Sequence, residues 1–136
     1  MQLNPYLFFD GNCEAAFTFY AQILRGEIEM LMRYGEAPGS DDAALRDKVI
    51  HVSLKFGGQR LMASDACPPQ NPYQRPQGFF VCVNVDSPNE AERIFKAFAE
   101  GGHVLVPLDK TFFSPAWGML VDRFGTPWMV NCPQDR

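Results

Sequence analysis

The sequence contains one pattern twice, and this internal repeat constrains its fold more than any other feature. The stretch YLFFDGNCEAAFTFYAQILRGEIEM, residues 6–30, aligns with CVNVDSPNEAERIFKAFAEGGHVLV, residues 82–106, at an offset of 76. Each copy reads as a strand, a polar turn, an amphipathic helix, a glycine and a second strand. Such self-similarity indicates a duplicated supersecondary unit.

The ends of the two halves repeat as well. KFGGQRLMAS, residues 55–64, aligns with RFGTPWMVNC, residues 123–132, at an offset of 68. The shared Phe-Gly pair predicts a hairpin tip between the last two strands of each half. The smaller offset is explained by a polar insertion in the first half, at residues 35–48. Each half is therefore predicted to be a βαβββ unit.

Apolar spacing supports the two helices. Ser87 is the expected N-cap of the second, with Pro88 at its first position and Glu90 completing a capping box. Apolar residues recur every three or four positions in both: Ala16, Phe19, Tyr20, Ile23 and Leu24 in the first helix, and Ala91, Ile94, Phe95 and Phe98 in the second.

A single βαβββ unit is too small to bury both its helix and its sheet. Two units joined edge to edge predict an α+β fold with one curved, roughly eight-stranded mixed sheet, helices outside and a concave groove. Residues 1–136 then form a single domain with repeats at 1–66 and 78–136, and the Pro-rich segment 67–78 links them. A ferredoxin-like order is the competing topology, but it does not explain the hairpin used twice.

Composition excludes several classes of partner. Hydrophobic residues make up 46% of the chain and charged residues 21%, as in soluble globular proteins. The net charge is −4, and the basic residues are scattered, which argues against a nucleic-acid partner. No apolar stretch approaches the roughly 20 residues that span a bilayer, and the N-terminal segment does not read as a signal peptide. We therefore expect no membrane partner and a cytoplasmic location.

The four cysteines do not indicate a metal or redox motif. Cys13, Cys67, Cys82 and Cys132 are widely spaced, and no CxxC pair is present. Reduced, buried thiols are the expected state.

The arrangement resembles the vicinal oxygen chelate superfamily, which includes glyoxalase I, bleomycin-resistance proteins and extradiol dioxygenases. The stretches NPYLFFDGNCEAAFTFY, GEIEMLMRYGEAP, HVSLKFGGQRLMASDA and DRFGTPWMVNC look like its PhnB-like branch. This resemblance covers nearly the whole chain and implies a glyoxalase/bleomycin-resistance fold. The branch often carries a demethylubiquinone methyltransferase label, but no Gly-rich cofactor loop follows the first strand, so we do not expect methyl transfer.

The resemblance also implies where a metal would bind. In metal-dependent members, a His from the first strand and a Glu from the last strand of each half hold a divalent ion that acts as a Lewis acid. The His positions fall near Asn4–Pro5 and Gly78–Phe80, and the Glu positions at Leu61 and Met129. None of these residues is the usual ligand. No cofactor is predicted, and a divalent metal is expected only through non-standard ligands.

Three titratable residues are weak candidates for acid–base chemistry. His51 lies in the alternating strand VIHVSLKF, where a structural hydrogen-bonding role is the commoner one. Its ordinary pKa of about 6.5 would suit catalysis if a carboxylate oriented the ring. Glu29 and Asp65 are the nearest such partners, although Asp65 is also a good turn cap.

Aromatic residues are the second group of candidates. The loop within Asp109–Leu120 carries three of them, which either bind a flat, apolar ligand or fill the core beneath a lid. The predicted ligand pocket comprises Tyr6, Phe8, His51, Met62, Phe80, Phe112, Phe113, Trp117 and Trp128.

Two main functions are open on the sequence, and a purely interacting or regulatory domain is a third alternative. The first is a PhnB-like protein without the usual metal ligands that holds a small aromatic or amphipathic molecule in the groove. The alternative is a lyase, isomerase or dioxygenase of the same superfamily with a relocated metal site or an acid–base mechanism, so enzyme activity is left undecided. Open sheet edges and exposed aromatics predict a homodimer in either case.

Overall fold

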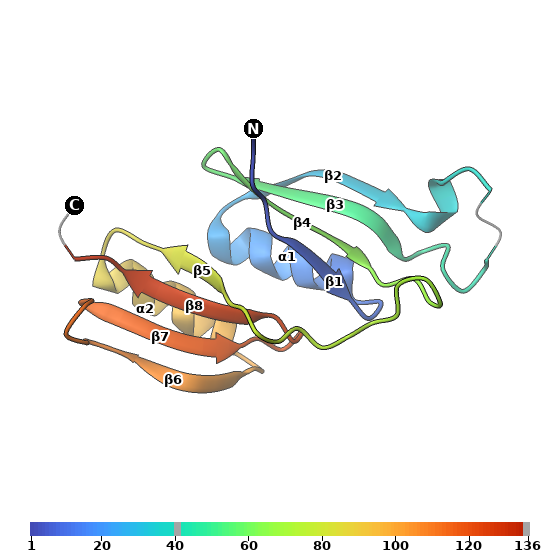
Figure 1. Ribbon diagram of the computed structural model, residues 1–136. Helices are drawn as coiled ribbons and strands as arrows, with labels where there is room; N and C mark the ends of the chain where they lie inside the picture. Colours follow the sequence, from blue (N-terminus) through green and yellow to red (C-terminus); the bar gives the residue numbers. More distant parts are fainter. Residues whose placement is uncertain (40–41, 135–136) are drawn as a thin grey trace. The chain divides into compact units, whose positions relative to one another are not determined.

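The protein is described by a computed structural model that covers residues 1–39 and 42–134 (Figure 1). The chain divides into two compact units, Met1–Gln74 and Arg75–Arg136. The boundary falls inside the segment 67–78 that was expected to link the repeats. Among the residues described, each unit holds one α-helix and one four-stranded sheet. No helix in the described ranges is long and apolar enough to cross a membrane.

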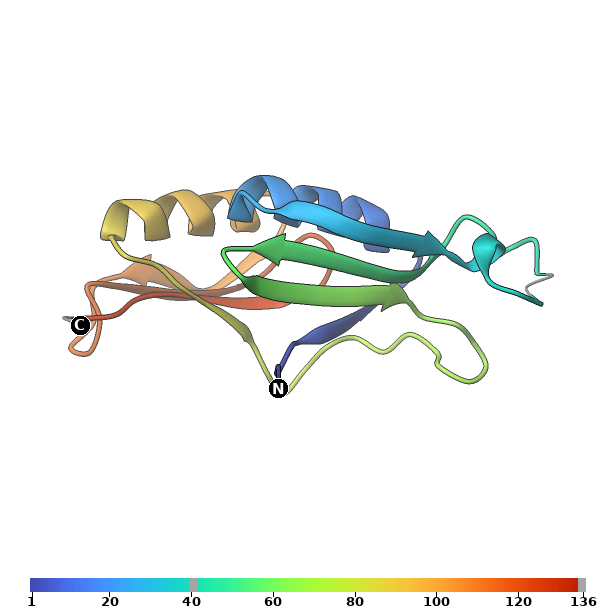
Figure 2. The same cartoon turned by 90° about the horizontal axis from the view of Figure 1, so that it is seen from above.

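The N-terminal unit builds its sheet in the order β1-β4-β3-β2. The strand β1 runs parallel to β4, and the other neighbours are antiparallel. Seen from above, α1 (blue) lies on one side of β2, β3 and β4 (Figure 2). The elements are β1 (Tyr6–Phe9), α1 (Cys13–Leu24), β2 (Glu27–Arg33), the 3₁₀ helix η1 (Tyr34–Glu36), β3 (Val49–Phe56) and β4 (Gln59–Asp65).

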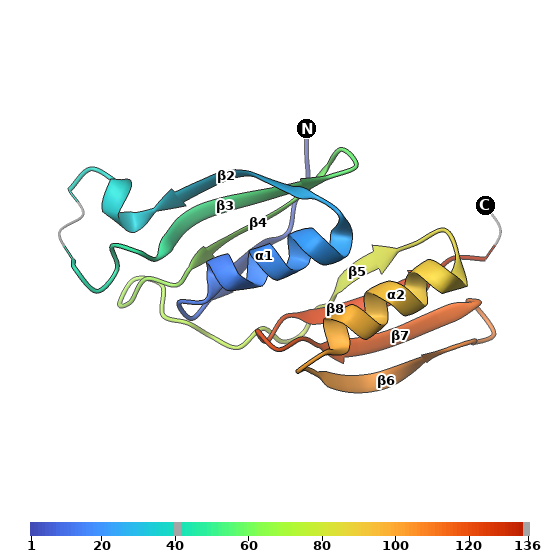
Figure 3. The ribbon, with the colours of Figure 1, turned by 180° about the vertical axis from the view of Figure 1, so that it is seen from behind.

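The C-terminal unit repeats this plan with the order β5-β8-β7-β6. Again the first strand is parallel to the last, and α2 lies against β7 and β8 (Figure 3). The α+β class and the two βαβββ repeats are thereby confirmed, with the eight strands divided into one four-stranded sheet per unit. The elements are β5 (Val81–Asn84), α2 (Pro88–Ala99), β6 (His103–Asp109), β7 (Ala116–Val121) and β8 (Pro127–Cys132).

A close contact between backbone segments follows each helix and explains why both repeats have a glycine there. A Cβ atom built on Gly26 would lie 2.5 Å from the carbonyl oxygen of Lys55, at the start of the β2–β3 ladder. A Cβ on Gly102 would lie even closer to the carbonyl of Val121, at the start of the β6–β7 ladder. Glycine lets the first residue of each second strand reach its partner.

The core of each unit lies between its helix and its sheet. In the N-terminal unit, apolar side chains of alternate strand positions meet the buried stripe of α1. Residues at 5% exposure or less there include Leu7, Phe9, Phe17, Tyr20, Val52, Leu54, Leu61 and Ala63. The cores therefore come from the period-2 and period-3.6 patterns in the sequence.

The C-terminal core centres on a stacked aromatic pair. The rings of Phe98 and Trp128 lie 4.1 Å apart between centroids, with planes 18° from parallel. Both side chains are at most 1% exposed. At the start of α2, the Ser87 hydroxyl accepts the backbone N–H of Glu90 at 3.2 Å, with Pro88 as the first helical residue, as the sequence predicts.

Candidate functional site

The face of the N-terminal sheet opposite α1, here called the distal face, gathers aromatic, thioether and small polar side chains. Strand register fixes the set, because residues paired across neighbouring strands project to the same side. Tyr6 stands beside Met62, which stands beside Ser53. The set comprises Tyr6 and Phe8 from β1, Met62 and Ser64 from β4, His51 and Ser53 from β3, and Met30 and Met32 from β2.

A tyrosine–histidine pair forms the polar centre of this face. The Tyr6 Oη lies 3.0 Å from Nδ1 of His51, and the two rings stack with centroids 5.7 Å apart. The ring of Phe8 lies 5.3 Å from that of Tyr6. When the phenol donates, neutral His51 carries its proton on Nε2. Tyr6 is 39% and Phe8 42% exposed, so a ligand can reach both rings.

Asp65 does not orient His51. Its carboxylate is buried and accepts two backbone N–H groups, from Cys13 at 3.0 Å and from Val49 at 2.8 Å. Asp65 thus ties the first turn of α1 to the start of β3, a structural role that also differs from the expected turn cap. Burial, and after it the nearby Asp65 carboxylate, raises the pKa of the Cys13 thiol far above its ordinary value.

Glu29 is also occupied elsewhere. It is the extra residue of a bulge between Ile28 and Met30, and its Oε1 accepts Arg60 Nε at 2.5 Å and the Ser53 hydroxyl at 3.0 Å. The hydrogen bond from Arg60, followed by that from Ser53, lowers the pKa of the Glu29 carboxyl. The structure thus replaces the expected carboxylate–histidine pairing with a Tyr6–His51 pairing that spacing in the sequence did not reveal.

The C-terminal unit carries its own distal face. There Asn131 Nδ2 donates to Asn84 Oδ1 at 3.0 Å, and Trp117 pairs with Asn131 in the β7–β8 ladder. The Phe113 ring lies 5.5 Å from Trp117 and 5.2 Å from Phe112. Phe112 is 94% exposed, so this aromatic cluster does not fill the core beneath a lid.

The predicted pocket residues therefore fall into separate places. Tyr6, Phe8, His51 and Met62 lie together on the N-terminal distal face, and Phe112, Phe113 and Trp117 form the exposed cluster of the other unit. Phe80 is half-buried just before β5. Trp128 requires a correction, because it projects toward α2 into the core. Met30, Met32, Ser53 and Ser64 were not among the predicted pocket residues, although the alternation of β2, β3 and β4 could have indicated them.

The two hairpins differ in length, which corrects one position in the metal-site alignment. The β3–β4 turn is the pair Gly57–Gly58, whereas residues 122–126 separate β7 from β8. The extra three residues reverse the side-chain alternation, so Leu61 points to the core while Met129 lies on the distal face. The structural counterpart of Met129 is Met62. Met129 pairs with Cys82 in the C-terminal unit, and Met62 pairs with Tyr6 in the N-terminal unit.

These positions offer donors that do not fit a hard divalent ion. Met62 and Met129 provide thioether sulfurs, and their strand partners Tyr6 and Cys82 provide a phenol and a thiol. Hard divalent ions prefer oxygen ligands such as carboxylate, carbonyl and water. Within residues 1–39 and 42–134, no group of three or more His, Cys, Asp or Glu side chains is arranged to hold a metal.

Comparison with known proteins assigns the family. Residues 1–131 match the family model described as 3-demethylubiquinone-9 3-methyltransferase. The chain belongs to this family. It is 29% identical to the YjdN protein of Escherichia coli in an alignment 141 positions long that covers 96% of this chain and 95% of YjdN.

Solved structures agree with this assignment. The chain is 47% identical to protein PA1353 from Pseudomonas aeruginosa, with a TM-score of 0.91 and 99% of each chain covered. A PhnB protein from Bacillus cereus is 25% identical, with a TM-score of 0.79 and 97% and 99% covered.

More distant structures show the superfamily fold. A FosX variant from Listeria monocytogenes, solved with Mn(II) and 1S,2S-dihydroxypropylphosphonic acid, superposes with a TM-score of 0.69 at 10% identity, over 98% of this chain and 93% of FosX. The fold is that of the vicinal oxygen chelate superfamily, and the PhnB-like resemblance is confirmed.

Proposed function

We propose that this PhnB-like protein binds a small aromatic or amphipathic molecule on the distal face of its N-terminal sheet. The observation that supports this most is the grouping of exposed Tyr6 and Phe8 around the Tyr6–His51 hydrogen bond. Binding sites for small molecules are mostly apolar, with a few polar groups that set orientation. The distal face has this composition.

The surrounding thioethers suit such a ligand. Met30 is 45% and Met32 36% exposed, and Met62 lies between Tyr6 and Ser53. Methionine side chains are flexible and polarisable, so they adapt to rings of different outline and make favourable sulfur–aromatic contacts. The Nε2–H of His51 is the polar group that would donate a hydrogen bond to a hydroxyl or carbonyl on the ring.

Binding can be tested with the amphipathic dye 8-anilinonaphthalene-1-sulfonate. We expect saturable binding at about one dye per chain, and a loss of affinity of roughly tenfold in Tyr6→Ala and Phe8→Ala, since a buried aromatic contact contributes on the order of 1–2 kcal/mol. Phe112→Ala, which removes an aromatic ring of the other unit, should leave this site unchanged. Near-UV circular dichroism checks that each variant is folded. Equal dye binding by the wild-type protein and all three variants, or no binding by any of them, contradicts the proposal.

The Tyr6–His51 pair also supports an alternative, in which the protein is a lyase, isomerase or dioxygenase relative. With Nδ1 accepting from Tyr6, His51 presents Nε2–H as a proton donor to a bound substrate. Turnover of the methylglyoxal–glutathione adduct and of catechols, with and without added divalent ions, tests this reading. Turnover that disappears in His51→Ala would favour the enzyme, and its complete absence would favour binding alone.

The family description names a methyltransferase, and the binding proposal makes a distinct prediction for that activity. Because no Gly-rich loop follows β1, we expect no transfer from S-adenosylmethionine to a demethylubiquinone analogue. Labelled methyl product formed in proportion to enzyme would contradict this.

The homodimer and the cytoplasmic location stay predictions. Sedimentation at micromolar concentration can test the homodimer.

A further inference from the structure

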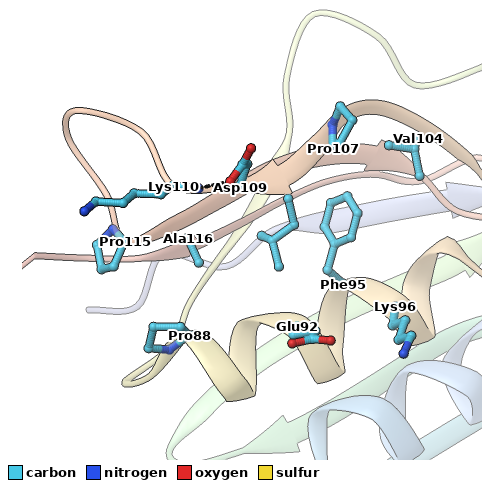
Figure 4. Close-up of a pocket in the computed structure, with 11 residues that line it drawn as sticks. Pro88, Glu92, Phe95, Lys96, Val104, Pro107, Asp109, Lys110, Pro115 and Ala116 are labelled. Atoms are coloured by element: carbon cyan, nitrogen blue, oxygen red, sulfur yellow. Dashed lines mark hydrogen bonds between the residues drawn. The ribbon is translucent and has the colours of Figure 1, made fainter.

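A hollow of about 510 Å³ lies between α2 and β6 in the C-terminal unit (Figure 4). It shares no residue with the ligand site proposed for the N-terminal sheet. Phe95 projects from α2 toward β6. Pro107 and Leu108 of β6 also line the hollow. Together with Val104 these side chains make an apolar wall.

A bulge in β6 gives the hollow its shape. Val106 pairs with Met119 and Asp109 pairs with Trp117, so both Pro107 and Leu108 stand opposite Gly118. A Cβ atom at Gly118 would lie 2.8 Å from Phe95 Cε2 and 2.9 Å from Leu108 Cα. The missing side chain lets Phe95 and the bulge pack closely over β7. Bulges commonly redirect side chains beside binding sites.

The first repeat provides an internal comparison. There the last residue of β2, Arg33, forms a bidentate pair with Glu14 of α1, both contacts being 2.9 Å, and so ties the helix to the edge strand. The positions 76 residues later are Asp109 and Glu90. Asp109 accepts the backbone N–H of the next residue, and Glu90 pairs with Arg93 on its own helix. The second repeat has thus lost this bridge over the gap between helix and edge strand.

Charges of both signs stand at the edge of the hollow. Glu92 and Lys96 come from α2, Asp109 is the last residue of β6, and Lys110 follows it, so the formal charges cancel. Within the described residues, Glu92 and Lys110 are in no ion pair. Charges that are not already paired can bind the opposite charges of a ligand.

Lys110 also marks where the apolar hollow meets a polar one. A neighbouring hollow of about 650 Å³ shares Pro88, Lys110 and Pro115 with the first and is lined in addition by Asp86 and Gln134. A ligand in the apolar hollow would therefore have one polar end at Lys110.

We propose that the α2–β6 hollow binds a small zwitterion with an apolar body, such as a free α-amino acid with an aromatic or branched side chain. The apolar body packs on Phe95 and Leu108, the carboxylate faces Lys110, and the ammonium faces Glu92. The exposed position of both charges keeps each ion pair weak, so selectivity comes from the two charges acting with the apolar wall.

The test is a titration of the ¹⁵N-labelled protein with L-phenylalanine, followed by amide chemical shifts. Saturable shifts should concentrate on α2 and β6 and leave β1 and β3 unchanged, which separates this site from the proposed ligand site of the N-terminal sheet. Two analogues of similar shape carry one charge each: 3-phenylpropionate is anionic and 2-phenylethylamine cationic. Both should bind at least about threefold more weakly.

Variants give a second readout. Glu92→Gln and Lys110→Gln should each raise the Kd of L-phenylalanine by about two- to fivefold, whereas Glu100→Gln, just beyond the end of α2, should not. Leu108→Trp should fill the hollow and abolish the shifts, with spectral dispersion confirming its fold. Equal affinity for all three ligands, unchanged Kd in both charge variants, or shifts centred outside α2 and β6 would each overturn the proposal.

Discussion

The indole N–H of Trp128 donates to Asp122 Oδ2 at 2.8 Å, and this bond joins the last hairpin to the C-terminal core. The other carboxylate oxygen of Asp122 accepts the backbone N–H groups of Phe124 and Thr126, at 2.8 and 3.0 Å. One buried carboxylate therefore shapes the turn and fixes the ring that stacks on Phe98. A tight network of this kind makes stability sensitive to a single residue.

Asp122→Ala should lower the free energy of unfolding by about 3 kcal/mol, because two buried donors and one partly buried donor lose their acceptor. Urea denaturation monitored by tryptophan fluorescence measures this change. Asp109→Ala removes a carboxylate that accepts an exposed backbone N–H, and we expect a loss of no more than about 0.5 kcal/mol. Similar losses in the two variants would show that the Asp122 network contributes little.

Which side chains of β4 face the core and which face the distal side can be tested at the adjacent residues Leu61 and Met62. Leu61→Gln places an amide against α1 and should cost about 3–5 kcal/mol, whereas Met62→Gln, on the distal face, should cost within about 1 kcal/mol. Thermal and urea unfolding of both variants provide the comparison. The reverse order would mean that the strand is shifted by one residue.

Gly26→Ala and Gly102→Ala should destabilise their units by similar amounts, about 1–3 kcal/mol each, because each new methyl group meets a backbone carbonyl across the ladder. Their combined effect should be close to additive, since the sites lie in separate compact units. Equilibrium unfolding of the two single variants and the double variant tests this equivalence. A neutral result at one glycine would show that the two repeats differ at this point.

The Tyr34 phenol should ionise at a higher pH than an ordinary tyrosine. Burial, followed by the nearby Cys67 thiol, raises its pKa to about 12, and its hydroxyl donates to the Asp65 carbonyl at 3.0 Å. Since the folded pKa exceeds the unfolded value of about 10, this group favours the folded state below pH 10 and loses that contribution as the pH rises toward 12.

Absorbance at 295 nm measures tyrosine ionisation directly. The difference between the titrations of the wild-type protein and Tyr34→Phe should show one phenol that ionises near pH 12. A difference centred near pH 10 would contradict the half-buried environment of Tyr34. A scan taken back to neutral pH confirms that the chain has stayed folded during the titration.

The amino-acid sequence by itself determined the repeated βαβββ plan, because strand alternation, helix spacing and the turn glycines are local signals present in both copies. It also predicted the Ser87 cap and brought Tyr6, Phe8, His51 and Met62 together as candidates. The sequence did not determine the position of Trp128, because an aromatic side chain suits a pocket and a core equally well.

Only the tertiary structure decided which face each side chain occupies and which partner it meets. The unequal turns reversed the alternation between Leu61 and Met129, and long-range register placed Tyr6, rather than Glu29 or Asp65, beside His51. The hollow beneath β6 likewise depends on Gly118 facing a bulge from another strand. Local periodicity cannot specify these features, because strand pairing and loop length set contacts between residues far apart in the chain.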